Sequence, residues 1–262
     1  MAGARIALVP TMGFLHAGHL SLIAEAKRRK ADEVVVSIFV NPVQFGPGED
    51  YAVYPRDEKA DIAKCRAAGA TAVFIPTPKE MYAKDRSVWV EEETLSRGLC
   101  GARRPGHFRG VCTVVAKLFN IVRPHFAVFG QKDFQQQAVI KRMVRDLDFG
   151  IEIVTAPIVR EASGLALSSR NTYLDGDSHD SALALSATLE FLSRLVKDSG
   201  KVNWSAARKK AQKILDAAGL KTDYIEAVDA ETLEPVKVLK SGVAVLLAAY
   251  AGRTRLIDNA VM

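Results

Sequence analysis

Hydrophobic and polar positions follow two different patterns along the chain. In the first two-thirds, short apolar runs rich in β-branched residues alternate with amphipathic stretches. The run 33–40 (EVVVSIFV) has no polar alternation, which is typical of a strand buried on both faces. The pattern predicts strands at 5–9, 33–40, 71–75, 126–129 and 151–156, and helices through about 29 and at 57–68, 112–122 and 133–147.

Strands that are separated by helices predict parallel βαβ units with right-handed crossovers. We therefore expect an α/β fold with a doubly wound, Rossmann-like parallel sheet over residues 1–175. After the Asp-Gly-Asp-Ser stretch at 175–178 the order changes: helices at 178–197 and 204–218 are followed by strands at 223–228, 243–249 and 254–259. This order predicts a second, smaller α+β domain over residues 176–262, which we expect to act as a lid.

Composition narrows the class of protein. The 262 residues are 48% hydrophobic and 25% charged, as in ordinary soluble proteins. No apolar run approaches the ~18 residues that a membrane span needs, and the first apolar run ends at Pro10, too early for a signal peptide. We expect a cytosolic protein without a membrane partner. Three cysteines form no close metal-binding pair and indicate reduced thiols.

The net charge of +6 permits a nucleic-acid partner but is spread along helical stretches. No basic stretch with interleaved aromatic residues suits base stacking. We therefore expect no nucleic-acid partner, and treat a non-catalytic nucleotide- or RNA-binding module as the alternative class.

Three polar loops follow strands, where the carboxyl ends of a doubly wound sheet bind ligands. The first, Pro10–His19, contains two glycines that allow close backbone approach and opens a helix whose free N–H groups favour anions. His16 and His19 lie three residues apart, and both can donate hydrogen bonds to phosphate oxygens. Alternatively they are capping or surface histidines, or two zinc ligands, although no third ligand at suitable spacing is evident.

The second and third loops are also suited to anions. In Gly130–Gln136, Lys132 would supply a mobile charge for phosphates, while Asp133 is placed to cap the next helix. In the third loop, Ser168 and Ser169 stand beside Arg170, a natural clamp for phosphate oxygens. The alternative for Lys132 is a structural lysine, and for Gln135 and Gln136 it is the surface of a helix. For the third loop, residues 159–171, the alternative is a turn with a helix cap.

Together the loops resemble the nucleotidylyltransferase superfamily, and within it the pantoate–β-alanine ligase (pantothenate synthetase) family. The resemblance extends from about residue 5 to the Thr-Arg-Leu-Ile-Asp-Asn stretch at 254–259, and its short Asn-Pro-x-Gln-Phe stretch at 41–45 is specific to this family. The motifs that support it, in order, are Val-Pro-Thr-Met-Gly at 9–13, His-x-Gly-His at 16–19, Ser-Ile-Phe-Val-Asn-Pro-x-Gln-Phe at 37–45, Tyr-Pro-Arg at 54–56, Gly-x-Lys-Asp-Phe-Gln-Gln at 130–136 and Leu-Ser-Ser-Arg-Asn at 167–171.

The resemblance implies an enzyme that joins pantoate to β-alanine through a pantoyl adenylate, with ATP cleaved to AMP and pyrophosphate. It implies His19, His16 and Lys132 as catalytic residues, Gln44 and Gln136 as pantoate ligands, and Gln44 also as a β-alanine ligand. The implied ATP ligands are Met12, Gly13, Phe14, Leu15, His16, Ala17, Gly18, His19, Gly130, Gln131, Lys132, Asp133, Val159, Leu167, Ser168, Ser169 and Arg170. It also implies Mg²⁺ and a homodimer.

The chain differs from the usual family sequence at two points, and two of the expectations have alternatives. Many relatives carry Glu where this chain has Gln131, and most begin with a longer segment before the first strand. Asp57 and Asp61 lie near the predicted triphosphate site, and Asp61 is a candidate Mg²⁺ ligand; solvent exposure on a helix is the alternative for both. A nucleotidylyltransferase that stops after attaching AMP or CMP is the rival reaction.

Overall fold

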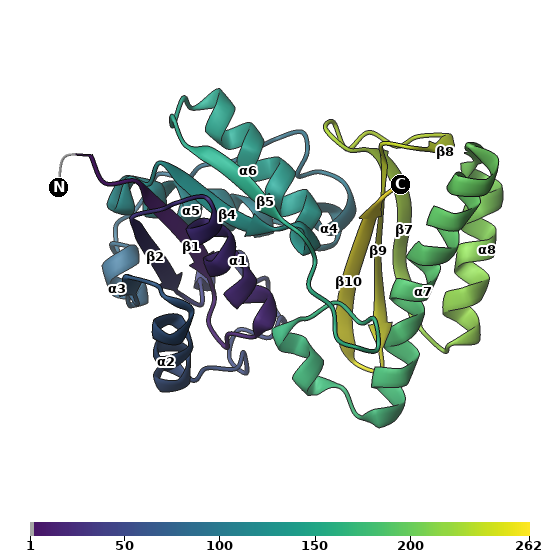
Figure 1. Ribbon diagram of the computed structural model, residues 1–262, viewed down its shortest axis with the longest axis horizontal. Coiled ribbons are helices and arrows are strands. Elements are labelled where there is room, and N and C mark those ends of the chain that lie inside the picture. Colours follow the sequence, from purple (N-terminus) through teal and green to yellow (C-terminus); the bar gives the residue numbers. More distant parts are fainter. Residues whose placement is uncertain (1–2) are drawn as a thin grey trace. The chain divides into compact units, whose positions relative to one another are not determined.

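The computed structural model describes residues 3–262 and forms two compact units (Figure 1). The first unit extends to Gln131 and includes Gln135–Pro157, whereas Lys132–Phe134 and Ile158–Met262 form the second. Among the described residues, no helix is both long enough and apolar enough to cross a membrane.

The first unit is built on a five-stranded sheet in which all neighbouring strands are parallel. The strand order is β3-β2-β1-β4-β5, so the direction of winding reverses between β1 and β4. This confirms the expected doubly wound sheet. The strands are β1 (Ile6–Thr11), β2 (Glu33–Ile38), β3 (Ala72–Phe74), β4 (Phe126–Gly130) and β5 (Glu152–Ala156).

The longer helices of this unit begin and end near their expected positions. Asp57 caps α2 by accepting a hydrogen bond from the backbone N–H of Ala60, and Gly69 ends the helix with φ of 85°. α5 begins before the expected residue 112, directly after Gly106, whose φ is 79°. The helices are α1 (Ala17–Arg28), α2 (Glu58–Ala68), α3 (Pro78–Met81), α4 (Leu99–Arg103), α5 (His107–Val122) and α6 (Phe134–Asp146), with 3-10 turns η1 (Pro42–Gln44) and η2 (Gln131–Asp133).

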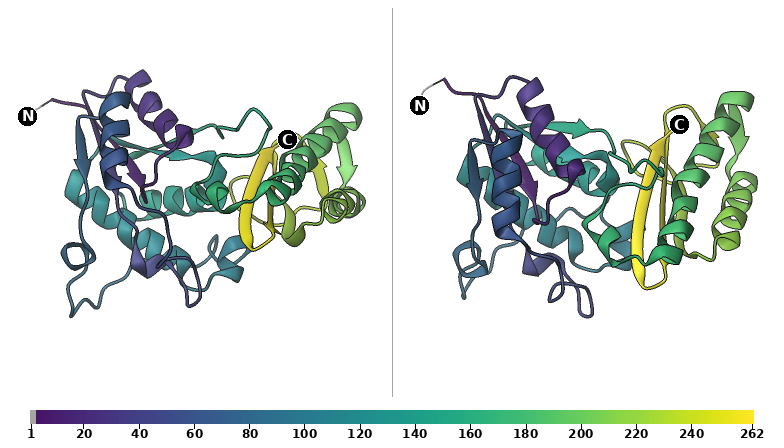
Figure 2. Two further views of the ribbon diagram at one scale, coloured as in Figure 1. Left: turned by 90° about the horizontal axis from the view of Figure 1, so that it is seen from below. Right: turned by 60° about the horizontal axis from the view of Figure 1, so that its bottom comes forward.

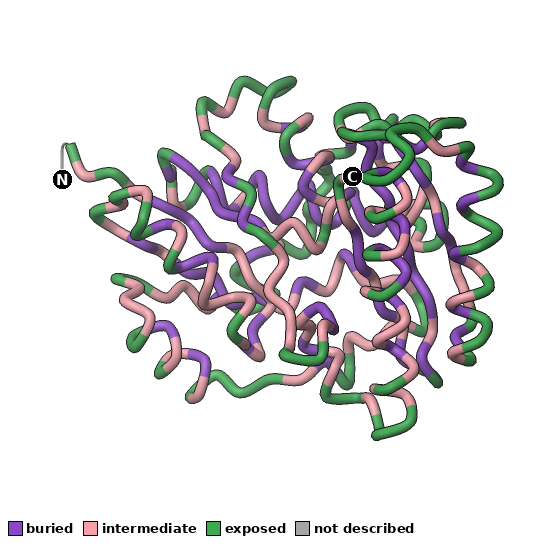
Figure 3. Tube along the Cα trace, turned by 45° about the vertical axis from the view of Figure 1, so that its right-hand side comes forward, coloured by how far each residue is buried: buried purple, intermediate pink, exposed green. Residues whose placement is uncertain are grey.

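Both faces of the parallel sheet are buried (Figure 3). Ala7 and Val9 of β1 pack in one cluster with Ile23 of α1. Leu8, between them, is equally buried and points to the opposite face because side chains alternate along a strand. Burial on both faces explains why the sequence of these strands shows no polar alternation.

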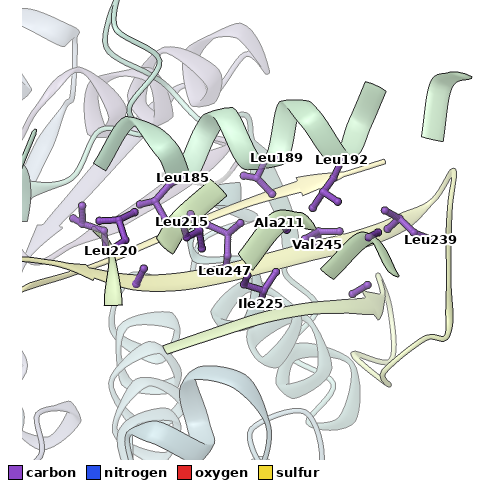
Figure 4. Packing of buried hydrophobic residues seen from close by; sticks show 14 of the residues in the cluster. Leu185, Leu189, Leu192, Ala211, Leu215, Leu220, Ile225, Leu239, Val245 and Leu247 are labelled. Carbon is purple, nitrogen blue, oxygen red and sulfur yellow. The ribbon is translucent and has the colours of Figure 1, made fainter. Parts of the chain in front are cut away.

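The second unit contains an antiparallel sheet in the order β10-β9-β7 and two helices packed against it (Figure 2). Its core is aliphatic, with Leu185 and Leu192 of α7, Leu215 of α8 and Leu247 of β9 in one cluster (Figure 4). This confirms the expected smaller α+β fold. Its elements are η3 (Ser169–Tyr173), α7 (Gly176–Ser199), β6 (Lys201–Asn203), α8 (Trp204–Ala217), β7 (Lys221–Asp229), β8 (Val238–Lys240), β9 (Val243–Ala251) and β10 (Thr254–Val261).

The division between the units lies at Pro157, earlier than the expected domain boundary at Asp175. Side-chain contacts explain the difference. Arg160 forms a bidentate ion pair with Asp258 of β10, at 2.7 and 2.9 Å, and Glu161 lies 2.7 Å from His179 Nε2 of α7. The segment 158–171 therefore packs with the elements that follow it.

Candidate active site

The loop between β1 and α1 is fixed by its own backbone and by two imidazoles. Gly13 and Phe14 have φ of 85° and 51°, so two consecutive residues are left-handed. His16 is the N-cap of α1, and its Nδ1 accepts a hydrogen bond from Gly18 N at 3.1 Å. His19 Nδ1 in turn accepts one from His16 N at 3.3 Å. The two histidines thus form a reciprocal capping box.

These contacts define where each neutral imidazole holds its proton. A nitrogen that accepts a hydrogen bond from a backbone N–H has no proton of its own, so in the neutral ring the proton lies on Nε2. The two rings are adjacent, with centroids 4.1 Å apart. Both His16 and His19 therefore have an Nε2–H donor at the start of a helix, where the backbone also favours anions. The capping interpretation and the phosphate interpretation are compatible, because they use different ring atoms.

Asp61 of α2 anchors the same loop. Its carboxylate accepts hydrogen bonds from Phe14 N and Leu15 N, both at 2.7 Å, and the Lys64 ammonium donates to Leu15 O at 2.7 Å. Asp61 is only 1% exposed, so the alternative that it is a solvent-exposed helix residue was wrong. Its burial follows from these two backbone donors, which replace water around the charge.

The turn after β4 contains Gly130 at the strand end, followed by Gln131, Lys132 and Asp133 in η2. The carbonyl of Lys132 accepts a hydrogen bond from Asn259 Nδ2 at 2.9 Å, which ties this turn to β10 in the second unit.

Gln135 is 3% exposed, so the alternative that it is a surface glutamine was wrong. Its amide accepts a hydrogen bond from Cys100 N at 2.9 Å and donates to Leu95 O and Gly98 O at 2.8 Å each. The amide therefore holds the segment that leads into α4. Gln136, next along α6, is partly buried.

The third loop is closed by its own hydrogen bonds. Leu167 N donates to Val159 O at 3.0 Å, and residues 160 and 166 form an antiparallel bridge. Ser168 caps η3 by accepting from Arg170 N at 3.2 Å, while Ser169 is buried. The alternative interpretation of this loop, a turn with a helix cap, is therefore present in the structure, and Ser168 forms the cap.

Gln44 lies at the end of η1, with its side chain in a hydrogen-bonded chain. Asn41 Nδ2 donates to Gln44 Oε1 at 2.9 Å, and Gln44 Nε2 donates to the thioether sulfur of Met12 at 3.2 Å. The second contact brings the predicted pantoate ligand next to the predicted ATP loop, within the first unit.

Comparison with known proteins decides the family. The sequence model described as pantoate–β-alanine ligase matches residues 1–261. The chain belongs to the pantoate–β-alanine ligase family. It is 57% identical to a pantothenate synthetase of Anaeromyxobacter dehalogenans over 98% of this chain and 91% of that protein. For a pantothenate synthetase of Pseudothermotoga lettingae the identity is 52%, over 98% and 91%.

Solved structures of similar proteins belong to the same family. The crystal structure of pantothenate synthetase from Thermus thermophilus is 44% identical with a TM-score of 0.94, covering 98% of this chain and 93% of that one. The ligase from Francisella tularensis, complexed with β,γ ATP and β-alanine, is 35% identical with a TM-score of 0.84, covering 100% and 91%. The resemblance, the fold class and the expectation of a ligase are confirmed.

The residues expected from the ligase family fall into two sets. Met12–His19, Gln44, Gly130, Gln131 and Gln136 lie in the first unit, where β1 and β4 flank the reversal of strand order. Lys132, Asp133, Val159 and Leu167–Arg170 lie in the second. No group of three or more metal-binding side chains occurs in the part of the chain that the structure describes, which leaves the zinc alternative for His16 and His19 without a third ligand.

Several residues that contact the expected site residues were not predicted from the sequence. Asn41 and Tyr82 orient Gln44, and Asn259 holds the Lys132 turn. Asn41 and Asn259 stand inside motifs that carried the resemblance, which was the available signal. Tyr82 has no such signal, because its contact with Asn41 spans 41 residues.

Proposed function

We propose that this ligase condenses pantoate with β-alanine in two steps at the expense of ATP. A pantoate carboxylate oxygen attacks the α-phosphorus of ATP, the bond to the β-phosphate bridging oxygen breaks, and pyrophosphate leaves. The amine of β-alanine then attacks the acyl carbon of the pantoyl adenylate. It loses a proton, AMP departs with the bonding electron pair, and pantothenate remains.

The observation that supports this proposal best is the capping box at the start of α1, in which the Nδ1 atoms of His16 and His19 accept from backbone N–H groups and Nε2 is assigned as the donor. The first step brings a carboxylate to a polyanion, so negative charge accumulates at the α-phosphate and on pyrophosphate. Donors whose orientation is already fixed stabilise that charge without reorganisation. His16 and His19 have this property because each Nδ1 is engaged by the backbone.

The proposed roles of the other residues follow the family. The residues proposed to bind ATP are Met12–His19, Gly130–Asp133, Val159 and Leu167–Arg170. Among them, Lys132 neutralises phosphate charge. Gln44 and Gln136 bind pantoate, and Gln44 also binds β-alanine. The ATP analogue and β-alanine in the Francisella tularensis ligase support both substrates.

Mg²⁺ is expected to accompany ATP. Among the described residues no cluster of three or more carboxylates, cysteines or histidines exists, and both Asp61 oxygens accept hydrogen bonds from the backbone. We therefore propose that phosphate oxygens and water supply most of the Mg²⁺ ligands, as is usual for this ion. A cytoplasmic location and a homodimer are likewise proposed from the family.

Isotope exchange tests the adenylate. Labelled pyrophosphate should exchange into ATP when pantoate and Mg²⁺ are present and β-alanine is absent, because the first step is complete and reversible without the amine. Exchange that begins only when β-alanine is added would contradict the two-step scheme. A rapid-quench search for pantoyl adenylate serves as the control for pyrophosphate that stays trapped on the enzyme.

A further inference from the structure

The side chain of Gln44 is the last member of a short chain of hydrogen bonds that are buried or partly buried. The Tyr82 hydroxyl donates to Asn41 Oδ1 at 2.7 Å. Asn41 Nδ2 donates to Gln44 Oε1 at 2.9 Å and to the backbone carbonyl of Gly110 at 3.2 Å. Asn41 and Gln44 are 1% and 7% exposed, so water does not compete for these contacts.

The carbonyl of Gly110 sets the direction of the whole chain. A backbone carbonyl can only accept, so the Asn41 atom facing it must be the amide nitrogen. The Asn41 oxygen then faces Tyr82, whose hydroxyl must donate. The Asn41 nitrogen can only donate, so the Gln44 atom facing it must be the oxygen. The Gln44 nitrogen consequently points away from Asn41.

Close packing between α5 and η1 keeps this arrangement in place. A Cβ at Gly110 would lie 2.4 Å from Val43 O and 2.7 Å from Gln44 Cα, so only glycine lets the helix approach this closely. His107 of the same helix contacts the Gln44 carbonyl through Nδ1 at 2.8 Å. Both the backbone and the side chain of Gln44 are therefore located by α5.

The Tyr82 hydroxyl remains a donor throughout the working pH range. Burial raises the pKa of Tyr82 to about 12, although the nearby Arg86 guanidinium and the hydrogen bond to Asn41 act in the opposite direction. Its ring lies 6.2 Å from that of Phe39 and below the Arg86 guanidinium at 4.7 Å. These contacts hold the ring independently of the hydroxyl.

We propose that Tyr82 is a positioning residue for substrate recognition: its hydroxyl satisfies the Asn41 oxygen and so stabilises the orientation that the Gly110 carbonyl sets. In that orientation the Gln44 nitrogen donates to an acceptor oxygen of the pantoate. This inference rests on the proposed function. In the structure that nitrogen donates to the Met12 thioether, a weak acceptor, which a carboxylate or hydroxyl oxygen replaces readily.

The test is a double-mutant cycle with Tyr82→Phe and Gln44→Leu, measured by steady-state kinetics. Tyr82→Phe removes only the hydroxyl and leaves the Asn41 oxygen unsatisfied, so the melting temperature should fall by a few degrees. KM for pantoate should rise about tenfold, with KM for ATP nearly unchanged. Gln44→Leu should raise KM for pantoate further. In the double variant the Tyr82 change should add no more than about twofold, because it acts through Gln44.

Two additional variants sharpen the result. Gln44→Glu keeps an oxygen toward Asn41 but replaces the donor by an acceptor, so it should impair pantoate use at least as much as Gln44→Leu. Tyr250→Phe, on β9 of the second unit, is the control for loss of a tyrosine hydroxyl and should leave both KM values unchanged.

Full additivity of the two changes, an equal rise in both KM values, or normal pantoate use by Gln44→Glu would each overturn the inference while the proposed function stands. A wild-type protein that forms no pantothenate would remove the proposed function, and the inference with it.

Discussion

At the scale of single residues, His16 and His19 cap a helix, and we propose that the same side chains also take part in the chemistry. Each imidazole has two nitrogens, and the capping box uses Nδ1 in both. That contact assigns the proton to Nε2 and fixes the orientation of the ring.

This division of labour predicts different outcomes for two substitutions of His19. His19→Ala removes the cap and the donor, so kcat should fall at least ~10²-fold and the free energy of unfolding by about 1 kcal/mol. His19→Glu retains the cap, because glutamate at this position accepts from the N-cap N–H, but its carboxylate has no N–H to donate to phosphate. Its stability should therefore match the wild type while kcat falls at least as far as in His19→Ala, as measured by turnover and urea unfolding. Near-normal turnover of His19→Glu would remove His19 from the catalytic residues.

His16 and His19 were predicted from the sequence, whereas the contacts that hold the polar loops in place were not. Asp61 contacts backbone groups 46 and 47 residues away, and Asn259 contacts one that is 127 residues away. Nearly every residue type has the same backbone N–H and carbonyl groups. The residue at the partner position therefore does not indicate that its backbone forms such a contact. Such contacts become visible only when the fold is known.

At the scale of elements, α2 stabilises the strained loop that precedes α1. Left-handed backbone at Phe14 is unfavourable for a residue with a side chain, and a Cβ at Gly13 would lie 3.1 Å from Asp61 Oδ2. The two hydrogen bonds to Asp61 offset this cost.

Asp61→Asn should therefore lower the free energy of unfolding by about 2 kcal/mol, because a neutral amide replaces a buried carboxylate that accepts two backbone N–H groups. KM for ATP should rise as the loop loses its anchor. The matched control is Asp57→Asn on the same helix, where asparagine caps as well as aspartate. Chemical unfolding and ATP titration of both variants check this. Equal stability of the two would contradict the anchoring role of Asp61.

The contact between the third loop and α7 should depend on pH. The hydrogen bond to Glu161 raises the pKa of His179 above its ordinary value of 6.5. Burial would raise the pKa of Glu161, but hydrogen bonds from His179 and Asn171 outweigh it and hold the pKa below its ordinary value of 4.5. The Glu161–His179 pair therefore contributes its full stabilisation of the fold between pH 4.5 and pH 6.5, the two ordinary pKa values. Its contribution is lost as pH rises through the raised pKa of His179, or falls through the lowered pKa of Glu161.

Accordingly, His179→Ala should lower the melting temperature more at about pH 6 than at about pH 9, because the wild-type imidazole is protonated only at the lower pH. Asp180, 3.9 Å from His179 Nδ1, is mostly exposed and adds little. Thermal melts of both proteins at the two pH values give the comparison. An equal difference at both values would show that the contact is not charged.

Long elements were predicted well, and several short ones were missed, although the three-residue strand β3 was predicted. A periodic pattern needs several turns or alternations to be recognised, and α3, β6 and β8 have only three or four residues. α4 begins at Leu99, beside the segment that the Gln135 amide holds, so distant contacts shape it more than its own sequence.

At the scale of the whole molecule, the change of pattern along the chain predicted both architectures, the parallel sheet and the smaller α+β unit. Alternation of strands and helices is a property of many residues at once and survives local exceptions. The position of the boundary between the units was harder to predict, because it depends on individual side-chain contacts. Arg160 and Asp258 are 98 positions apart, and Glu161 and His179 are 18 positions apart. For this reason the sequence predicted the presence of two units, but it did not predict the residue at which the first unit ends.

The central claim is that the protein is an AMP-forming ligase. The most direct measurement is mass spectrometry of the products formed from ATP, Mg²⁺, pantoate and β-alanine, with each substrate omitted in turn. We expect pantothenate and AMP in equal amounts, pyrophosphate alongside them, and none of these products without pantoate or ATP. An adenylylated acid that accumulates without any amide, or ADP and phosphate in place of AMP and pyrophosphate, would contradict the account.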